Sequence, residues 1–326
     1  MHNDQQDMVV RPQSQQSSSN QRTPSQIERS QKLVPGAPFG LDRSLRRIEH
    51  RKINDLQLKA DFRIYAHKTR RDIPDGNLFY KEMHMRELFT VDHQGWGADH
   101  SRLCMPPDLS AVSAGEAESF CRSMRADFLN TGRSKHDQPP VRTIPPNVKP
   151  YFFAPLQMPG DDVIRNHSPI TVIQYMSALS QWAELRGRNV VFKLHPGQPA
   201  EIEQEARKAA AASRYVFLLN ENVHSLISAA HAVVVINSGV GFESLIHGKP
   251  VITLGACDYQ WMTFRATVSD LDAAWDFAGD YSEQQRLQGF RFIHYYYHQH
   301  AYLNSEQSRT SVKPRLAEYL EEHVRN

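Results

Sequence analysis

The sequence predicts an α/β fold built around an open, doubly wound parallel sheet, and the pattern of residues 190–255 indicates it. Short apolar runs rich in β-branched residues, at 190–194 and 232–236, are each followed by polar residues or glycine, as buried parallel strands are. Between them, an Ala/Glu-rich segment with helical character, 199–213, precedes another short strand, 215–219. Because strands and helices alternate, we expect a ligand at the carboxyl ends of the strands.

The composition excludes several classes of protein. The chain of 326 residues is long enough for a large core and for two domains. Lys plus Arg number 38 against 36 Asp plus Glu, so no net field favours nucleic acid as a partner. No apolar run approaches the roughly 20 residues that span a bilayer, and the N-terminus lacks the apolar core of a signal peptide. Three widely spaced cysteines, Cys104, Cys121 and Cys257, indicate a reducing cytoplasm without disulfides or a zinc site.

Basic residues gather in two stretches near the N-terminus, at 43–52 and 67–71. Two interpretations stay open. The residues form an ordinary solvated surface, or they attract anionic lipid headgroups or an acidic polysaccharide. The second interpretation would add a peripheral association with the inner face of the membrane.

Composition shifts divide the chain into four parts. The boundaries rest on a Gln/Ser/Asn-rich start and on a Pro-rich tether at 138–150. The expected parts are a disordered tail and linker at 1–43, a small N-terminal α/β domain on the acceptor side at 44–150, a Rossmann-like nucleotide-sugar-binding domain at 151–280, and C-terminal helices that pack across the domains at 281–326.

The N-terminal part is expected to hold few regular elements. They are a short basic helix at 44–58, strands at 62–66 and 78–82, and a helix at 116–129. The stretch 88–101 contains Gly95 and Gly97, which would let a ligand or another backbone approach closely. A Gly-rich turn held by the packing of Trp96 explains the same residues equally well.

The C-terminal part begins with a predicted strand at 151–157 and a polar loop at 159–162 that leads into an arm at 166–168. An amphipathic helix follows at 171–186. Its expected apolar stripe is Ile173, Met176, Leu179, Trp182 and Leu185. Beyond residue 255, we expect a loop at 258–267 that could fold back over a ligand, a long aromatic helix at 282–303 and a final helix at 312–324.

Three polar groups follow successive strands of the predicted sheet. They are the pair Asp161 and Asp162, the imidazole of His195, and a turn that contains Ser238 and opens a helix. A helix N-terminus with free N–H groups and a hydroxyl suits a nucleotide phosphate. Lys193 lies two residues before His195, so both side chains would face the same side of a strand.

Simpler explanations exist for each group alone. A His-Pro dipeptide often ends a strand, a Ser-Gly turn is often only a helix cap, and paired aspartates often mark a turn. Their shared position at adjacent strand ends favours the functional interpretation.

Three segments resemble the bacterial capsule polysaccharide biosynthesis proteins, a family that includes transferases of the acidic sugar Kdo. The segments are 155–161, 193–196, and 237–245 with the following Gly-Lys-Pro-Val at 248–251. The His-Pro and Ser-x-x-Gly-x-Glu combination is also similar to bacterial sialyltransferases, which likewise use CMP-sugars.

The resemblance implies a GT-B-like glycosyltransferase that carries its donor nucleotide on the C-terminal domain. It would act without a metal or other cofactor, take CMP-Kdo as donor substrate, retain configuration, and act on a surface-polysaccharide or glycolipid acceptor. Asp161 matches the acidic residue thought to be catalytic, His195 is placed beside it, and Glu82 is a candidate from the N-terminal domain. The implied donor-binding set is Lys193, His195, Pro196, Asn237, Ser238, Gly239, Gly241 and Glu243, with Gln157, Asp162 and Lys249 as secondary candidates.

Departures from the family pattern keep alternatives open. Gly239 stands where a second hydroxyl is common, the doubled aspartate leaves Asp161 and Asp162 as alternatives, and the N-terminal domain is short. One alternative function is a UDP- or GDP-sugar transferase of the same fold. The other is a non-catalytic partner that binds polysaccharide or assembles a complex.

Overall fold

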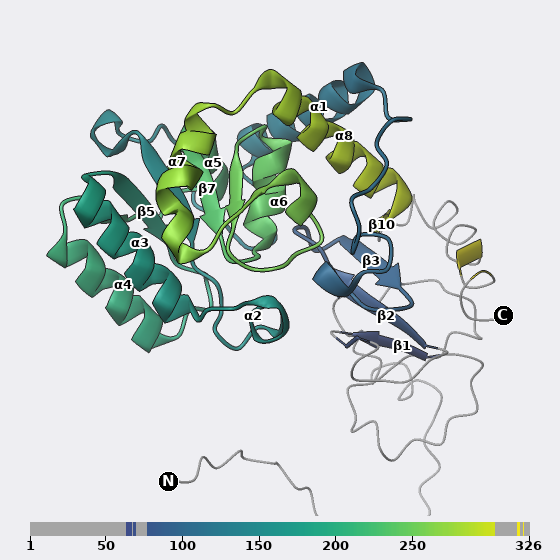
Figure 1. The fold of residues 1–326 in the computed structure, drawn as a ribbon, viewed down its shortest axis with the longest axis horizontal. Coiled ribbons are helices and arrows are strands. Elements are labelled where there is room, and N and C mark those ends of the chain that lie inside the picture. Colours follow the sequence, from purple (N-terminus) through teal and green to yellow (C-terminus); the bar gives the residue numbers. More distant parts are fainter. Residues whose placement is uncertain (1–62, 67, 70–76, 304–317, 320–321, 323–326) are drawn as a thin grey trace, which may run out of the picture. The chain divides into compact units, whose positions relative to one another are not determined.

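The protein is described by a computed structural model that covers residues 63–66, 68–69, 77–303, 318–319 and 322. Its main sheet has six parallel strands in the order β6-β5-β4-β7-β8-β9 (Figure 1). The chain builds outward from β4 to β6 in one direction and from β7 to β9 in the other. This reversal beside β4 is the topological switch point of a doubly wound fold. The predicted α/β fold with a doubly wound parallel sheet is confirmed.

The strands of this sheet are short and almost entirely buried. Their bounds are β4 Tyr151–Pro155, β5 Asn189–Lys193, β6 Val216–Leu218, β7 Ala232–Val235, β8 Val251–Thr253 and β9 Phe264–Arg265. Alternate residues of β4 enter two different cores, because successive side chains of a strand point to opposite faces. Tyr151 and Phe153 belong to one core, and Phe152 and Ala154 to the other.

Helices cover both faces of the main sheet. The core that contains Phe153 also includes residues of α1 (Ala114–Thr131), α5 (Val223–Ala229), α6 (Gly239–Ile246) and α8 (Glu283–Gln299). The opposite core includes residues of α2 (Asp162–His167), α3 (Val172–Arg186), α4 (Ala200–Ala212) and α7 (Leu271–Gly279). Helix α1 was expected in a separate N-terminal domain, yet it packs against α8, α6 and α5.

Local sequence signals set the helix ends. Thr171 and Gln174 form a capping box at the start of α3, and Gly187 ends that helix with a φ of 61°. Ser282 and Gln285 form the same box at the start of α8. The predicted helices 116–129, 171–186 and 199–213 are confirmed within a few residues as α1, α3 and α4.

A second, smaller sheet has the order β1-β2-β3-β10 and mixed strand directions. Its strands are β1 Arg63–Ala66, β2 Asn77–Glu82, β3 Leu88–Asp92 and β10 Ala301–Leu303. Strand β10 comes from the far end of the chain and pairs antiparallel with β3 (Figure 1). The two N-terminal strands were predicted, whereas β3 and β10 were not.

Four sequence expectations need correction. The long helix 282–303 ends at Gln299, because the last three residues pair with β3 as β10. The arm at 166–168 mostly belongs to helix α2. The loop 258–267 contains strand β9. In α3, Ile173 and Leu185 are exposed, while Val172, Tyr175 and Ala183 are buried, because a three-residue repeat drifts around a helix of 3.6 residues per turn.

Several expectations fall outside the described residues. They are the disordered tail, the basic helix at 44–58, most of both basic clusters and nearly all of the final helix. The described residues belong to one compact unit, and the four-part division stays a prediction. Across the described ranges, the chain has no helix that combines the length and the apolarity needed to cross a membrane.

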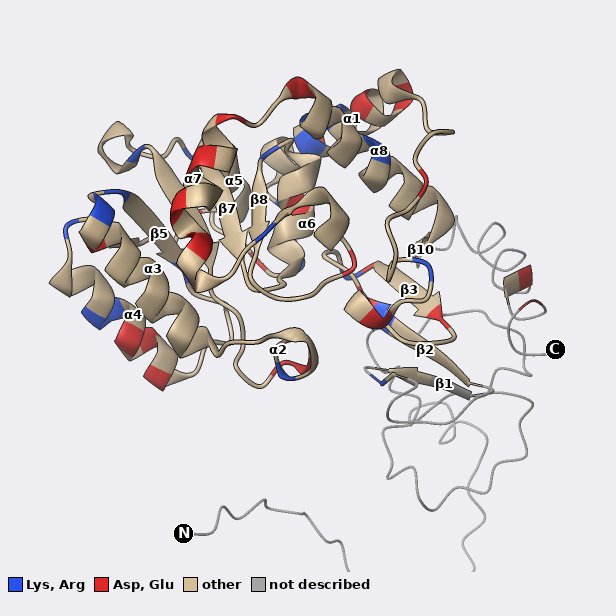
Figure 2. Ribbon diagram, viewed as in Figure 1, with Lys and Arg blue, Asp and Glu red and all other residues tan. Residues whose placement is uncertain are grey.

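Charged residues of both signs lie on the outer helices. Helix α4 carries acidic and basic side chains on the same surface, as Figure 2 shows, and Glu203 pairs with Arg207 one turn later. Such pairs contribute little to stability because water screens them.

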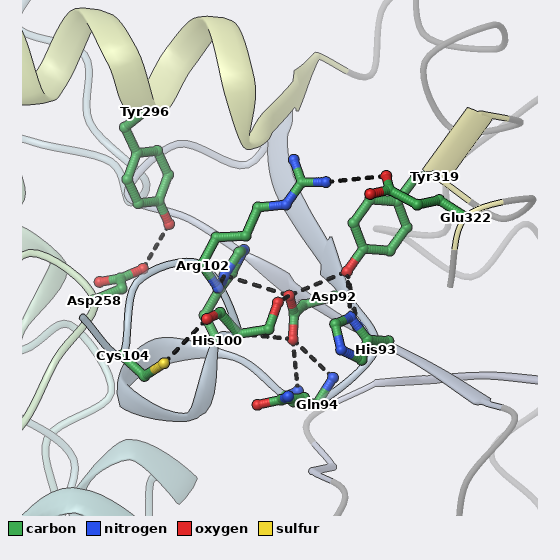
Figure 3. A network of polar contacts seen from close by, with 12 residues as sticks. Asp92, His93, Gln94, His100, Arg102, Cys104, Asp258, Tyr296, Tyr319 and Glu322 are labelled. Carbon is green, nitrogen blue, oxygen red and sulfur yellow. Dashed lines mark hydrogen bonds and ion pairs between the residues drawn. The ribbon is translucent and has the colours of Figure 1, made fainter. Parts of the chain in front are cut away.

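A buried polar network joins the small sheet to the C-terminal segment (Figure 3). Asp92 at the end of β3 accepts hydrogen bonds from the backbone N–H groups of Gln94, Gly95 and Ser101 at 2.8 to 3.1 Å. Its other oxygen accepts from the hydroxyls of Ser101 and Tyr319. Asp92 therefore organises the Gly-rich turn, and Trp96 is fully buried within that turn. This arrangement supports the packing interpretation of residues 88–101.

Asp92 should make a pH-dependent contribution to stability. Burial alone would raise the pKa of this carboxyl, but His100 and the hydrogen bonds from Ser101 and Gln94 hold its pKa below the usual range. A lowered folded-state pKa stabilises above the unfolded pKa, and that stability is lost as pH falls through the folded value. We expect Asp92→Asn to lower the free energy of unfolding at pH 7 by about 2–4 kcal/mol, since it leaves buried donors without their acceptor.

Urea unfolding at pH 7 and pH 2.5 measures this difference. Asp276→Asn is the matched control, because Asp276 is exposed on α7. The deficit of Asp92→Asn should be smaller at pH 2.5, below the ordinary pKa of an aspartate, and a deficit equal at both pH values would contradict the assignment.

Candidate functional site at the switch point of the main sheet

The predicted polar groups line one cavity beside the carboxyl ends of β4, β5 and β7. Its volume of about 270 Å³ lies near the lower end of the roughly 300–1,000 Å³ of small-molecule sites. The small sheet and two loops close its other side. The lining residues used below are Lys81, Glu82, Ser134, Lys135, His136, Gln157, Asp161, Lys193, His195, Pro196, Asn237, Ser238, Gly239, Glu243, Asp258 and Tyr259.

A pair of buried amides joins the two strands that flank the switch point. The Nε2 of Gln157, after β4, donates to the Oδ1 of Asn237, after β7, at 2.9 Å. The backbone N–H of Asn237 donates back to the Oε1 of Gln157 at 3.2 Å. The Nδ2 of Asn237 donates to the carbonyl of Val163 at 2.9 Å, which holds α2 in place. Both residues were predicted to bind the donor, but their side chains form hydrogen bonds within the floor of the cavity.

Asp161 sits at the N-cap of α2, where its carboxylate accepts from the N–H of Val163 at 3.3 Å. Its Oδ1 lies 3.9 Å from the Nζ of Lys81 on β2, so a cation from the small sheet faces this carboxylate. The same ammonium lies 4.2 Å from the centre of the Trp96 ring, a cation–π contact. Asp162 instead pairs with Arg165 and is absent from the described lining. The geometry separates the two aspartates that the sequence left as alternatives.

His195 presents a defined tautomer to the cavity. Its Nδ1 accepts a hydrogen bond from the N–H of Gly197 at 3.1 Å, so the proton of the neutral ring lies on Nε2. The ring of His136 meets it edge-on at 4.7 Å between centroids. Burial and the neighbouring His136 lower the pKa of His195, opposed by Asp161, which keeps the ring neutral near pH 7. Neutral His195 is then a hydrogen-bond donor rather than a cation.

Lys193 lies beside His195 as expected, with its Nζ 3.4 Å from the Oδ1 of Asn220. Burial lowers the pKa of this lysine, while Glu221 raises it. Lys81 has a pKa lowered by burial in the same way, against the opposing effect of Asp161. Together with Lys135, these lysines bring three ammonium groups to one cavity, which suits an anionic ligand.

The turn after β7 starts helix α6 with Ser238 as its N-cap. The Oγ of Ser238 accepts from the N–H of Val240 at 3.2 Å, and its carbonyl accepts from the hydroxyl of Tyr259. Gly241 does not line the cavity, because the Tyr259 ring packs directly on its Cα and leaves no room for a Cβ. The expected helix start with its Ser238 cap therefore lies at the cavity, Gly241 is a packing residue, and the anion site itself stays a prediction.

Glu243 is buried in the wall of the cavity. Its Oε1 accepts from the hydroxyl of Ser134 at 2.9 Å, and its Oε2 has no hydrogen-bond partner among the described residues. Burial raises the pKa of this carboxyl to about 8, and the Ser134 hydrogen bond only partly opposes the shift. Glu243 is therefore mostly protonated at neutral pH and offers the cavity a neutral O–H.

Of the remaining predicted residues, three line the cavity and one does not. Glu82 lies in the cavity, paired with Lys135 at 3.2 Å. Pro196 and Gly239 line it as well. Lys249 lies elsewhere, since its Nζ donates to the carbonyl of Ala230 at 2.9 Å. No group of three His, Cys, Asp or Glu side chains within the described part of the chain is placed to share a metal ion.

The sequence did not single out Lys81, Ser134, Lys135 or His136, although all four line the cavity. The last three lie just before the stretch interpreted as a domain tether, and they reach the site through tertiary packing. Lys81 was visible only as a strand residue beside Glu82. No local pattern distinguishes such residues from ordinary surface charges.

The fold and the cavity define a doubly wound α/β protein with a cavity lined by cationic and hydrogen-bonding groups at the switch point. Residues 131–275 match the family model described as capsule polysaccharide biosynthesis protein. This segment contains Asp161, His195, Ser238 and Glu243, so the resemblance seen in the sequence is confirmed over that range.

Two relatives each match a part of the chain. The capsule polysaccharide export protein KpsS of Escherichia coli is 26% identical over 156 residues, which are 44% of this chain and 40% of KpsS. Protein FixF of Sinorhizobium fredii is 33% identical over 162 residues, which are 46% of this chain and 38% of FixF. The matched segments thus span well under half of either relative.

Solved structures match the chain only loosely. The β-Kdo 2,7-transferase of Thermosulfurimonas dismutans KpsC has a TM-score of 0.44 at 17% identity, over 79% of this chain and 85% of that chain. Its β-Kdo 2,4-transferase has a TM-score of 0.38 at 17% identity, over 63% and 73%. Staphylococcus aureus MnaA with UDP has a TM-score of 0.35 at 12% identity, over 53% and 47%. Superpositions this loose assign no activity.

The protonation of Glu243 predicts an unusual pH dependence of stability. A folded-state pKa raised above the unfolded value gives stability that is full below the unfolded pKa and is lost as pH rises through the folded value. We expect the free energy of unfolding of Glu243→Gln, a neutral isostere, not to show this loss between pH 5 and pH 8.5. At pH 8.5 it should exceed that of the wild type by a few kcal/mol, because a shift of one pKa unit corresponds to about 1.4 kcal/mol.

Urea unfolding at the two pH values measures the effect. Glu201→Gln, on the exposed face of α4, is the control and should follow the wild type. Parallel pH profiles for Glu243→Gln and the wild type would show that the carboxyl is ionised in the folded protein.

Proposed function

We propose that the protein is a glycosyltransferase of capsule or surface-polysaccharide synthesis that uses a CMP-activated acidic sugar, with CMP-Kdo as its donor. One observation carries the proposal: a carboxylate, an imidazole N–H and a serine-capped helix N-terminus converge on a single cavity at the switch point. That set matches what transfer from a sugar phosphate needs. The match of residues 131–275 to capsule biosynthesis proteins supports the sugar class.

The helix N-terminus at Ser238 and the Nε2–H of His195 would bind the phosphate of the donor. A phosphate oxygen gains negative charge when its bond to the sugar breaks, and oriented donors stabilise that charge. Neutral His195 supplies such a donor through its Nε2–H and does not need to be protonated first. The lysines Lys81 and Lys135 lie on the opposite wall, where they would face the carboxylate of an acidic sugar.

A retaining transfer then takes two steps. Asp161 attacks the anomeric carbon, the bond to the CMP oxygen breaks, and CMP leaves with the electron pair. The acceptor hydroxyl next attacks the same carbon, the bond to Asp161 breaks, and the hydroxyl proton passes to a base. Glu82, held by Lys135 on the side of the small sheet, is the candidate base. No step in this sequence calls on a metal ion or other cofactor.

The partners under this proposal are the nucleotide-sugar donor and a glycan or glycolipid acceptor. A cytoplasmic location, with peripheral contact to the inner face of the membrane, would give access to a lipid-linked acceptor. The proposed function involves no nucleic acid.

The nucleotide can be tested before the reaction. In a thermal-unfolding panel of CMP, UDP and GDP, CMP should raise the midpoint, because a ligand at about 100 times its Kd stabilises by roughly 2.7 kcal/mol. His195→Ala and Ser238→Ala should reduce this shift. Ser113→Ala is the matched control, since Ser113 caps α1 in the same way away from the cavity. Stabilisation by UDP or GDP alone would change the donor class.

Transfer is tested by incubation with CMP-Kdo and CMP-sialic acid and by measurement of CMP release with and without an acceptor. We expect Asp161→Asn to lower the rate about 10³-fold or more while it still binds CMP, as loss of a reacting group does. Asp162→Asn is the control, because Asp162 pairs with Arg165 outside the described lining, and it should keep activity. Full activity of Asp161→Asn would remove Asp161 from catalysis, and no CMP release from either donor would favour the non-catalytic alternative.

A further inference from the structure

A second cavity of about 660 Å³ lies outside the site described above. Its walls are the segment before α1, the short helix η6 (Gln260–Met262), the end of α7 and the first turns of α8. The volume falls within the roughly 300–1,000 Å³ of sites for small ligands. Neither the sequence motifs nor the proposed transfer chemistry uses any residue of this cavity.

Aromatic rings form one part of the wall. Trp261, Phe277 and Tyr281 line the cavity, and all three are half-buried. The Nε1 of Trp261 donates to the carbonyl of Leu103 at 2.9 Å, which fixes the indole in place. The rings of Phe277 and Tyr281 meet edge-on at 5.7 Å. Rigid rings of this kind offer flat apolar surface to the C–H faces of pyranose sugars with little loss of entropy on binding.

Polar side chains of α8 form the facing part. Gln284, Gln288 and Arg291 follow one another at four and three residues, so they share one face of the helix. Amide groups donate and accept at once, as adjacent sugar hydroxyls require. The Nε of Arg291 is buried and has no hydrogen-bond partner among the described residues. No carboxylate of the described residues pairs with this guanidinium, so its two Nη groups can contact the carboxylate of a ligand in the cavity.

The mixture of groups decides the class of ligand. A lipid chain is disfavoured as the ligand. It would displace water from the amides, the hydroxyls and the arginine of the cavity without offering them hydrogen bonds in return. The exposed carboxylate of Asp108 on the rim disfavours a small inorganic anion but can accept from sugar hydroxyls.

We propose that this cavity is a glycan-binding subsite that holds a stretch of an acidic oligosaccharide chain. Sugar rings lie against Trp261 and Tyr281, and a sugar carboxylate pairs with Arg291. The inference deepens the proposed function and rests on it for the identity of the glycan as the acceptor. The binding chemistry itself rests on the cavity alone.

The position of the subsite links it to the first cavity. Asp258 and Tyr259 line the first cavity, and Trp261 and Thr263 line the second. One short segment, 256–263, therefore separates the two. An acceptor chain bound here would lie on the outer side of that wall, with its remaining sugars free to reach the reacting end.

The test is calorimetric titration of the whole protein with two probes: a hexasaccharide of alternating glucuronate and N-acetylglucosamine, and neutral maltohexaose. The acidic probe should bind more tightly. Arg291→Met and Gln288→Leu should each weaken it about tenfold or more, which equals about 1.4 kcal/mol and is the range of a lost hydrogen bond to a charged or polar group. Gln299→Ala is the control on the same helix outside the cavity, and it should bind as the wild type does. CMP affinity and the thermal midpoint of each variant check that the fold and the donor site are intact.

The outcomes separate this inference from the proposed function. CMP binding without hexasaccharide binding, or hexasaccharide binding unchanged in both cavity variants, overturns the subsite and leaves the transferase in place. Equal affinity for maltohexaose overturns the carboxylate contact of Arg291. Hexasaccharide binding that both cavity variants weaken, in a protein that binds no nucleotide and releases no CMP, supports the subsite and removes the transferase.

Discussion

The site depends on one constraint, the reciprocal hydrogen bonds between the side chain of Gln157 and the side chain and backbone of Asn237. They tie β4 to β7 at the point where the strand order reverses, the place where neighbouring loops diverge and a crevice forms. The backbone carbonyl of Gln157 also accepts from Gln198, and Asn237 holds α2 through the carbonyl of Val163. Asp161, His195 and Ser238 therefore take their positions from one buried amide pair. Buried amides are costly unless fully bonded, so this pair favours a single arrangement of the three loops.

The small sheet supplies the charge that the main sheet lacks. Lys81 and Glu82 arrive on β2, and Lys135 arrives on the loop after α1. Lys81 is held between the carboxylate of Asp161 and the ring of Trp96, and Trp96 is fixed by the turn that Asp92 organises. The Asp92 network of Figure 3 thus affects the site indirectly, because it positions the Trp96 ring that contacts Lys81. A stable small sheet is consequently a condition for the electrostatics of the cavity, not only for the fold.

Sequence patterns predicted the main sheet well because the signals there are local. Buried β-branched runs mark β5 and β7, a capping box and a terminal glycine mark α3, and an N-cap serine marks α6, all without knowledge of their neighbours. Strand β10 was missed because its three residues continue a helical pattern, and only pairing with β3 decides their structure. Among the site residues, Asp161, His195 and Ser238 follow strands and were visible. Lys135 and His136 were not, since nothing in the sequence reports that α1 packs on the main sheet and returns its loop to the cavity. Lys249 and Gly241 were included in the predicted site but have structural roles. Lys249 donates to the carbonyl of Ala230, and Gly241 makes room for the ring of Tyr259.

The wall between the two cavities is fixed on both sides. Tyr259 donates to the carbonyl of Ser238 at the start of α6, and Trp261 donates to the carbonyl of Leu103 on the segment before α1. Tyr296 of α8 adds a hydrogen bond to Asp258 at 2.5 Å (Figure 3). The loop expected to fold over a ligand is therefore a braced partition between two cavities. Tyr259 contacts the Ser238 turn of the first cavity and Trp261 lines the second, so a shift of this partition would couple the two cavities. Any such coupling of binding free energies must be equal in both directions, so a glycan that tightens nucleotide binding would itself be bound more tightly when the nucleotide is present.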